Sequence, residues 1–515
     1  MSEFDIAIVG FGPTGKLLAR LLSDEGHSVA VVERWPETYP LPRAIAYFHD
    51  TKRMFHAIGT MREISRISRP MDRYQWYNAN WEMLVELGFG GESLSGGPEG
   101  YTFSQPDLED ILDRDLRRRG NVTFFKGFEA QALTQDDGGA SLTIRPFDVP
   151  SARAPEGPDQ VLRAQYVVGC DGANSMVRTA MGTGSKDLGF DARWLVVDIK
   201  PHDMAAHDIP DAAQWCNPAR PTTIVPCGID KRRWEFMMAL EEDEASFTTD
   251  ENVWSMIDQW IKPGEGEIIR KAVYNFRSLI AEKWRDGRLL LAGDAAHLMP
   301  PFMGQGMNSG LRDALTLGFE LDLVLKRQAP DSLLDNYQKE RADHVQSYIE
   351  LSMEMGKVVC ILDEAAAAER DAAFAAGHLP PPPVPPVLTG GLVAKNGDAV
   401  APGAGVLMPH AMLKTPLGDV ERLDNVAGRR FFVVTRNGAA AGLDAVQRAA
   451  LARIDAAVID LDSTHPETDG KLAAFLDRHG ADAVIARPDF HSFGVADTPG
   501  ALAALVDELA AGLTA

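Results

Sequence analysis

The chain has 515 residues, of which 51 are lysine or arginine and 74 are aspartate or glutamate, so its formal net charge is −23. Nucleic-acid binding needs a basic surface, and this acidic balance argues against it. No apolar run reaches the ~20 residues that span a bilayer, so no membrane partner is expected. The chain starts without a basic signal region, and its four cysteines form no C-x-x-C pair. These features predict a cytoplasmic enzyme of several domains, without a disulfide framework or a metal site.

The N-terminal residues predict a strand–helix–strand unit. Residues 4–9 are an apolar run typical of a buried parallel strand, residues 16–25 have a helical pattern, and residues 28–32 predict a second strand. Between the first strand and the helix lies a G-x-G-x-x-G pattern. Gly10 permits the tight turn, Gly12 lets the backbone approach a pyrophosphate, and Gly15 lets helix and strand pack closely.

The same unit has two further features of a dinucleotide site. The N-terminus of the helix offers free N–H groups and a positive dipole end to an anion. Glu33 ends the second strand, where a carboxylate can accept hydrogen bonds from ribose hydroxyls. Together these features predict dinucleotide binding, although they do not separate NAD from FAD.

The rest of the chain divides by composition. Residues 186–290 contain runs rich in β-branched and aromatic side chains, which predict mostly antiparallel strands. A long helical region follows Gly310. Six prolines between Pro380 and Pro386 predict an extended spacer. Beyond them, strand and helix patterns predict a small separate α/β domain that keeps its own core.

Two later segments also follow strand-like runs. Residues 169–178 read GCDGANSMVR, and residues 293–308 contain GDAAH followed by PPFMGQGMN. Each segment alone fits a strand-to-helix turn, because Asp, Gly and Asn favour such places. The occurrence of both, in this order after the N-terminal glycine pattern, is difficult to explain by turns alone.

With these three motifs in this order, the chain resembles the class A flavoprotein aromatic hydroxylases, the para-hydroxybenzoate and phenol hydroxylase superfamily. The segments MPPFMGQGMNSGLRDA, NPARPTT and RRWEFM are similar to the 3-(3-hydroxyphenyl)propionate hydroxylase branch. The segment ARPDFHSFGVADTPGAL is similar to the thioredoxin-like C-terminal domain of the phenol hydroxylase subgroup.

The resemblance implies an α/β fold with three parts. A Rossmann-like FAD-binding domain of the glutathione-reductase type would carry an inserted, mainly antiparallel β-sheet substrate domain, and a thioredoxin-like domain would follow. The resemblance also suggests a homodimer. The implied FAD-binding domain comprises residues 1–75, 100–185 and 280–350, the substrate domain residues 76–99 and 186–279, the helical and Pro-rich linker residues 351–390, and the thioredoxin-like domain, which lacks redox cysteines, residues 391–515.

The resemblance implies bound FAD, with NADH or NADPH as co-substrate. Glu33, with Arg34 beside it, would hold the adenosine ribose, and Arg43 would lie near the pyrophosphate and flavin. Gln105 would touch the ribityl chain and Asp294 a ribityl hydroxyl, while the motif of Asp171 serves both FAD and the nicotinamide cofactor. The segment after Arg43 does not have the pattern of the helix usual in the family. The other implied FAD contacts are Gly10, Gly12, Gly15, Gly304 and the backbone amides of Gly306, Met307 and Asn308.

The implied reaction is hydride transfer from the nicotinamide to FAD, then oxygen transfer from a flavin hydroperoxide to a phenolic ring. Hydroxyphenylpropanoid acids are the first substrates to test, followed by other substituted phenols. The Pro300 carbonyl would lie beside the substrate hydroxyl, and His297 is expected to pack or to orient its neighbours. The implied substrate contacts are Met303, Phe236 and Arg220, which with Arg233 is a candidate for binding a substrate carboxylate.

Three alternatives stay open at this point. A flavin-dependent reductase or dehydrogenase of the same fold would act on another substrate. A flavin halogenase would share the nucleotide motifs, but the chain lacks the W-x-W-x-I-P segment of those enzymes. A non-catalytic flavin-binding scaffold is the third. A yellow protein that consumes NAD(P)H and oxygen only when an aromatic compound is present would favour the hydroxylase.

Overall fold

Strand β1 (Ser2–Val9) lies inside an eight-stranded sheet of the computed structural model, which describes residues 2–39, 44–149, 152–379 and 384–514. It pairs in parallel with β2 (Val29–Glu33) and β11 (Gln160–Gly169), and its central residues are fully buried. The sequence predicts this burial from the continuous apolar run. The other strands of the sheet are β8 (Val122–Lys126), β9 (Phe128–Asp136), β10 (Gly139–Pro146), β17 (Arg285–Asp286) and β18 (Leu289–Leu291).

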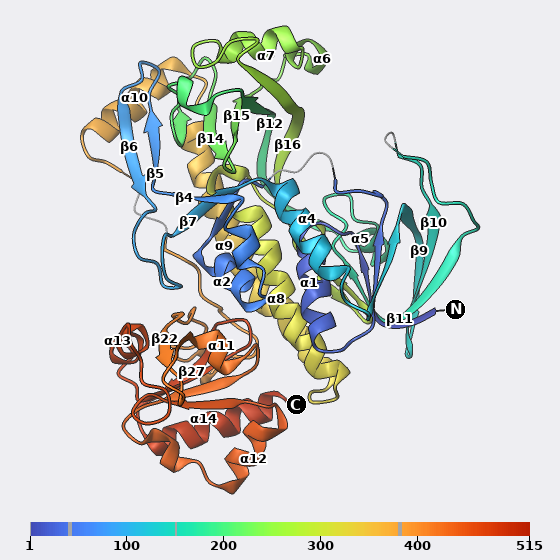
Figure 1. The fold of residues 1–515 in the computed structure, drawn as a ribbon, viewed down its shortest axis with the longest axis vertical. Helices are drawn as coiled ribbons and strands as arrows, with labels where there is room; N and C mark the ends of the chain where they lie inside the picture. The colour runs from blue at the N-terminus through green and yellow to red at the C-terminus, as the bar shows by residue number, and fades with distance from the viewer. Residues whose placement is uncertain (1, 40–43, 150–151, 380–383, 515) are drawn as a thin grey trace.

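Helices pack against the first sheet and against each other (Figure 1). The helix α1 (Pro13–Asp24) lies against α8 (Gln305–Leu325), where Gly318 leaves room for Leu18 and Leu21. The helix α1 begins directly after the parallel strand β1, whereas α8 begins after the 3-10 helix that ends at Met303. The further helices of this part are α4 (Gln105–Leu116), α5 (Met176–Ala180), α9 (Asp335–Val359) and the short 3-10 helices η2 (Gly293–Ala295), η3 (Pro301–Met303) and η4 (Asp331–Leu334).

A second sheet of eight strands lies beside the first. Its neighbouring strands are antiparallel except for one parallel pair, β5 (Arg73–Tyr77) with β13 (Ala213–Trp215). The prediction of antiparallel strands in this region is therefore confirmed. The remaining strands are β6 (Met83–Gly88), β12 (Ser185–Pro201), β14 (Thr222–Cys227), β15 (Lys231–Met237), β16 (Gly266–Ala281) and β19 (His297–Leu298).

The two faces of the second sheet have different neighbours. On the face that we call the outer face, Leu195 and Trp234 pack beneath α6 (Glu244–Phe247) and α7 (Asp250–Ile257). On the inner face, Trp194 packs against Phe302 of η3, with ring centroids 5.7 Å apart, in a cluster that also contains Val359 of α9. The short helix η1 (Met204–Ala206) lies in a loop of this part, and α10 (Glu364–Ala375) packs beside β6.

A small three-stranded sheet joins the two larger ones. It contains β3 (Ala46–Phe48), β4 (Ser68–Met71) and β7 (Gly100–Phe103). Two helices, α2 (His49–Ala57) and α3 (Met61–Ile64), connect β3 to β4. The segment after Arg43 does not have the pattern of the helix usual in the family, but the structure has a helix there: α2 buries Met54 and Phe55, and its first turn carries Asp50. Arg43 itself lies outside the described residues.

The C-terminal segment forms a four-stranded sheet in the order β25-β24-β26-β27. The first pair is parallel and the other two are antiparallel. The strands of this sheet are β24 (Phe432–Thr435), β25 (Ala457–Asp460), β26 (Ala483–Ala486) and β27 (Ser492–Ala496). The helices of the segment are α11 (Leu423–Ala427), η5 (Ala439–Gly442), α12 (Ala445–Arg453), α13 (Lys471–Arg478) and α14 (Pro499–Gly512). Two further strand pairs are β20 (Lys395–Asn396) with β21 (Ala399–Val400), and β22 (Met412–Lys414) with β23 (Val420–Arg422).

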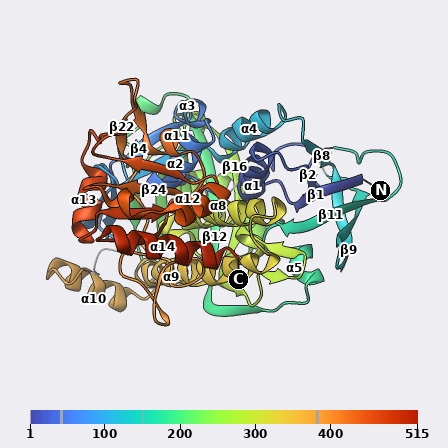
Figure 2. The same cartoon turned by 90° about the horizontal axis from the view of Figure 1, so that it is seen from below.

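The C-terminal segment packs against α2, α8 and α9, as both views show (Figures 1 and 2). One of its apolar clusters is its own, but the other includes Phe319 and Leu323 of α8. The expectation of a separate core is therefore correct for one face only. Pro380–Pro383 of the predicted spacer lie outside the described residues, and the residues just before them form the end of α9 and the helix α10.

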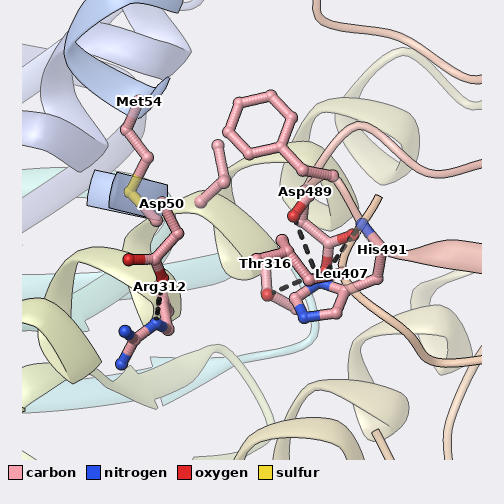
Figure 3. A pocket seen from close by; sticks show the side chains of 9 residues that line it. Asp50, Met54, Arg312, Thr316, Leu407, Asp489 and His491 are labelled. Carbon is pink, nitrogen blue, oxygen red and sulfur yellow. Dashed lines mark hydrogen bonds and ion pairs between the residues drawn. The ribbon is translucent and has the colours of Figure 1, made fainter. Parts of the chain in front are cut away.

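Buried ion pairs cross this junction. Arg53 of α2 donates two hydrogen bonds to Asp424, at 2.6 and 2.7 Å, and Arg487 pairs with Glu340 of α9. Figure 3 shows a small cavity nearby, with Asp50 and Arg312 on one side and Asp489 on the other. Its volume of about 10 Å³ is at the limit for one water molecule, so it offers no room for a substrate.

Three possible features are absent from the described part of the chain. No helix there is both long enough and apolar enough to cross a membrane. Within the same residues, no group of His, Cys, Asp and Glu side chains is arranged to hold a metal ion. All four cysteines are free thiols.

Candidate cofactor and substrate site

The loop between β1 and α1 has room for a ligand at one of its three glycines. Gly10 has a φ of +98°, and a Cβ there would lie 2.3 Å from the Cys170 carbonyl oxygen. A Cβ at Gly15 would lie 2.2 Å from the Gly10 carbonyl oxygen. At Gly12, which is the N-cap of α1, a Cβ would meet no atom within 4 Å, and no side chain caps the helix. The open space and the N–H groups of α1 fit a pyrophosphate.

Glu33 stands at the end of β2, next to this loop. Its two carboxylate oxygens accept hydrogen bonds from the backbone N–H groups of Phe11 (2.8 Å) and Trp35 (2.9 Å). A carboxylate has lone pairs left for a ribose hydroxyl after two such bonds. The neighbouring Arg34 is half exposed and lies 3.9 Å from the Glu129 carboxylate. Glu33 therefore holds the loop in shape, at the position where the sequence places a ribose.

The Asp171 and Asp294 motifs lie side by side at the same edge of the sheet. The Asp171 carboxylate accepts hydrogen bonds from the Ser175 hydroxyl (2.5 Å) and the Met176 N–H (2.7 Å), and so caps α5. Burial raises the pKa of Asp171. Arg178 then donates to the Ala295 carbonyl at 2.7 Å, which ties this motif to the half-buried Asp294 in η2.

Thr14 joins the first motif to the third. A Cβ at Gly293, whose φ is +62°, would lie 2.7 Å from the Thr14 hydroxyl oxygen, and one at Gly310 would lie 2.4 Å from it. Only residues without a side chain allow α1, η2 and α8 to approach this closely. The three motifs that the sequence separates by some 300 residues thus form one continuous surface.

The N-terminus of α8 faces the small sheet. Gly304, with a φ of +62°, is its N-cap, and no side chain caps the N–H groups of the first turn, which contains Gly306 and Met307. Asn308 is fully buried: its amide donates to the Gly304 carbonyl (2.7 Å), and its oxygen accepts from the Thr51 hydroxyl (2.7 Å). The uncapped amides fit the partly negative edge of a flavin, and Asn308 holds the turn that presents them.

Gln105 belongs to a buried polar chain at the start of α4. Its side-chain oxygen accepts from the Ala44 N–H (2.6 Å), and its amide donates to Glu109 (2.8 Å). Glu109 in turn accepts from Lys16 of α1 at 2.6 Å, and both side chains are 2% exposed. The sequence gives no signal for this pair, because a lysine within a helix normally faces water. These hydrogen bonds fix the backbone at Ala44, the first described residue after position 43.

The loop η3 lies between α8 and α9. The Pro300 carbonyl accepts a hydrogen bond from the Ser352 hydroxyl of α9 at 2.8 Å, and Ser352 is fully buried. One turn later, a Cβ at Gly356 would lie 2.7 Å from the Phe302 ring, so α9 fits tightly against η3. Met303 closes η3 and is half-buried.

His297 is part of a buried ion network. It lies 2.6 Å from Asp313, whose other oxygen accepts from Arg341 at 2.9 Å, and burial of all three is nearly complete. Burial opposes ionisation of Asp313, but His297 and Arg341 outweigh it and lower its pKa. Asp313 also accepts the Gly293 N–H at 3.0 Å. His297 therefore acts on the site by fixing α8 and η2, as the sequence predicts.

Two residues proposed from the sequence for substrate contact lie on the outer face. Phe236 is opposite Leu195 in the β12–β15 ladder and packs in the cluster beneath α7. Arg220 forms two hydrogen bonds with Glu242 and stacks on Phe247 of α6. Since η3 contacts the other face, the structure does not bring these two side chains to the Pro300 loop. Strand alternation is the reason: it turns Phe236 away from the face that touches Phe302.

The inner face carries polar groups that the motifs do not identify. Thr223 is opposite Glu235 in the β14–β15 ladder, so the two share this face. The Gln214 amide oxygen accepts from the hydroxyls of Tyr74 (3.0 Å) and Thr223 (2.7 Å). The alternation in RRWEFM is the signal that could have found Glu235, because it places Glu235 opposite in direction to Trp234 and Phe236.

Comparison with known proteins identifies the family. A family model described as the FAD binding domain matches residues 3–352. A probable NADH-specific resorcinol 4-hydroxylase from Rhodococcus jostii is 36% identical over 98% of this chain and 94% of its own length. The chain belongs to the class A flavoprotein aromatic hydroxylases. A second model, the HcaD C-terminal domain, matches residues 405–512 of this hydroxylase-family chain.

Other members of the family extend the comparison. A 3-(3-hydroxy-phenyl)propionate/3-hydroxycinnamic acid hydroxylase from Mycolicibacterium smegmatis is 31% identical over 94% of this chain and 89% of its own. The crystal structure of the flavin-dependent monooxygenase PieE with FAD and substrate superposes with a TM-score of 0.82, at 21% identity over 99% of both chains. Aklavinone-11 hydroxylase, crystallised with FAD and aklavinone, gives a TM-score of 0.77 at 21% identity, again over 99% of both. These likenesses establish the fold, and FAD is the cofactor of the family.

Proposed function

We propose that this protein is an FAD- and NAD(P)H-dependent monooxygenase that hydroxylates a phenolic ring. The observation that carries the proposal is the position of η3: it lies between the N-terminus of α8 and the inner face of the second sheet, with Phe302 against Trp194 at 5.7 Å. Groups that fit a flavin edge and groups that fit an aromatic ring are thereby adjacent.

The residues of this chain would bind and orient the reactants. FAD, when bound, supplies the redox and oxygen-transfer chemistry. The N–H groups of α1 beside Gly12 would hold its pyrophosphate, with Glu33, Asp171 and Asp294 around the rest of the nucleotide. The first N–H groups of α8, at Gly306 and Met307, would stabilise negative charge on the flavin edge.

The Pro300 carbonyl is the proposed catalytic group. A backbone oxygen beside the substrate hydroxyl would accept its hydrogen bond and so orient the phenolic proton and the ring that carries it. Ser352 uses one lone pair of this oxygen, which leaves the other for the substrate. The aromatic side chains of the inner face and of η3 would exclude water from the reacting ring, and Met303 would border the same space.

The names of the relatives suggest two first substrates, resorcinol and 3-(3-hydroxyphenyl)propionate, and NADH as the donor. The test is a panel of phenols scored for hydroxylated product, together with NADH oxidation and hydrogen peroxide release. We expect product with at least one phenol. NADH oxidation without product, for every phenol, would favour a reductase of the same fold instead.

The domain division is part of the proposal. We propose that the first sheet with its helices binds FAD, that the second sheet covers the substrate, and that residues 391–515 are thioredoxin-like without redox cysteines. The parallel pair β24–β25 followed by the antiparallel β26 and β27 supports the last assignment. A cytoplasmic homodimer is proposed on family resemblance, and light scattering of the purified protein would test the dimer.

A further inference from the structure

Glu235 is a buried carboxyl group that forms an ion pair with Arg233. It is 8% exposed, in the middle of β15. The closest cationic group is the Arg233 guanidinium, 3.7 Å away, which is longer than a hydrogen bond. Beside this ion pair, the Glu235 carboxyl group keeps lone pairs for a further hydrogen bond.

Glu235 lies on the face of the sheet that contacts η3. It is opposite Val196 of β12 and Thr223 of β14, and Val196 belongs to the apolar cluster that contains Trp194 and Phe302. The neighbouring Val225 belongs to a small apolar cluster against which Ile45 packs, and Ile45 directly precedes β3. The carboxyl group therefore faces the space between the second sheet and the proposed flavin site.

The arginines near Glu235 are already paired. Arg233 forms a two-bond ion pair with Asp198, at 2.6 and 3.0 Å, and Arg270 donates to the same carboxylate at 3.0 Å. Arg270 also donates to the Tyr274 hydroxyl at 2.9 Å. Asp198 binds the Nε and Nη2 nitrogens of Arg233, and Glu235 lies near the remaining nitrogen, Nη1. A substrate carboxylate placed here would compete with Asp198 and Glu235 for the same two arginines.

An uncharged hydroxyl group is suited to this place. Burial raises the pKa of Glu235, which favours the neutral acid, and a carboxylic acid both donates and accepts. The nearby hydroxyls of Tyr74 and Thr223 are both committed to Gln214, so they do not satisfy Glu235.

We propose that Glu235 hydrogen-bonds a second hydroxyl group of the substrate ring, and that the enzyme thereby selects an uncharged dihydroxybenzene over a phenolic carboxylate. This inference rests on the proposed function, since it places a phenol between η3 and the sheet. The inference extends the proposed function, because it names the side chain that would recognise the ring substituent and the class of substrate that this side chain favours.

The experiment measures substrate binding to the oxidised, FAD-loaded enzyme from the change in flavin absorbance. Resorcinol, phenol and 3-(3-hydroxyphenyl)propionate are titrated into the wild type, Glu235→Leu and Glu235→Gln. Glu267→Gln is the control, because Glu267 is an exposed glutamate of the same sheet. We expect the wild type to bind resorcinol roughly tenfold more tightly than phenol, and more tightly than the propionate. Glu235→Leu should lose the tenfold advantage, Glu235→Gln should keep part of it, and Glu267→Gln all of it.

Two results would overturn the inference while leaving the hydroxylase proposal intact. One is a wild type that forms product but binds the propionate more tightly than resorcinol, which needs no variant and so holds even if Glu235→Leu fails to fold. The other is a Glu235→Leu enzyme with full FAD content and an unchanged ratio of resorcinol to phenol affinity. If the wild type hydroxylates no phenol at all, the proposed function fails, and this inference fails with it.

Discussion

The Ser352 hydroxyl donates a 2.8 Å hydrogen bond to the Pro300 carbonyl, across the boundary between α9 and η3. Ser352 and Gly356 are one turn apart on α9, and both contact η3: the first through this bond and the second through its closeness to Phe302. The proposed catalytic oxygen is therefore oriented by a helix that is distant in sequence from the flavin motifs. The same helix carries Glu340, which pairs with Arg487 of the C-terminal segment.

Ser352→Ala should lower the coupling of NADH oxidation to hydroxylation. Without the hydroxyl, the Pro300 carbonyl loses its fixed direction and retains an unsatisfied lone pair, at a net cost of about 1 kcal/mol. We expect a severalfold larger share of hydrogen peroxide per NADH, because the carbonyl then orients the substrate ring less firmly. Ser352→Thr should restore part of the coupling. Ser347→Ala, at a hydroxyl that bonds within α9 only, is the control. Unchanged coupling in Ser352→Ala would show that Ser352 has a packing role alone.

Asp294→Asn should weaken FAD binding while the fold persists. The carboxylate stands in η2, where the three motifs meet, and losing a charge-assisted hydrogen bond costs ~1.5–3 kcal/mol, or roughly ten- to a hundredfold in affinity. Titration of the apoprotein with FAD, followed by flavin fluorescence, measures the change. Asp137→Asn, in the exposed turn between β9 and β10, is the matched control. An Asp294→Asn protein with wild-type affinity would remove Asp294 from the FAD site.

The sequence predicts much of the first sheet because local patterns determine it. The apolar run at residues 4–9, the glycine spacing and Glu33 each have one physical interpretation, and the structure places them as expected. The helix α2 was missed because its apolar positions are few: its stability comes from contacts of Met54 and Phe55 with distant segments and from the Asp50–Arg312 ion pair. The local sequence pattern gives no information about contacts between segments that are distant in the chain.

Substrate contacts were harder to predict than cofactor contacts. Backbone amides at helix N-termini follow from glycine motifs, but the inner and outer faces of a sheet buried on both sides look alike in sequence. Phe236 and Glu235 are adjacent in the chain and face opposite directions. Only the contact between Trp194 and Phe302 shows which face meets η3. The Lys16–Glu109 pair and the Ser352–Pro300 bond join residues far apart in the sequence and had no local signal either.

Arg487→Met should destabilise the whole protein, contrary to the sequence expectation that the C-terminal segment is a separate domain with its own core. Arg487 is fully buried and neutralises both Glu340 of α9 and Asp489, so its loss leaves two buried carboxylates without a cation. Breaking a buried ion pair in this way costs about 3–5 kcal/mol. Denaturant unfolding of the FAD-loaded protein measures the loss, and Arg478→Met, at an exposed arginine of α13, is the control. For the same reason, a truncation near residue 390 should be poorly soluble. A soluble truncation that keeps its FAD would contradict this.

The contact between α2 and the C-terminal segment should weaken as the pH falls below about 6.5. Burial, with a smaller effect from the nearby Arg53, lowers the pKa of His410 to about 3, and burial lowers that of His56 to about 4. A histidine whose pKa is lower in the folded state stabilises the fold fully above its unfolded value near 6.5, and this contribution is lost as the pH falls towards the folded value.

For His410 the loss amounts to about 2 kcal/mol at pH 5 relative to pH 7.5. Asp424, its neighbour at 3.3 Å, stays ionised over this range, because Arg53 outweighs the effect of burial and lowers its pKa. Thermal unfolding at the two pH values should therefore show a smaller drop in melting temperature for His410→Gln than for the wild type. His378→Gln, at an exposed histidine, should leave the drop unchanged. If His410→Gln loses as much stability between pH 7.5 and pH 5 as the wild type, proton uptake at this junction does not control its acid sensitivity.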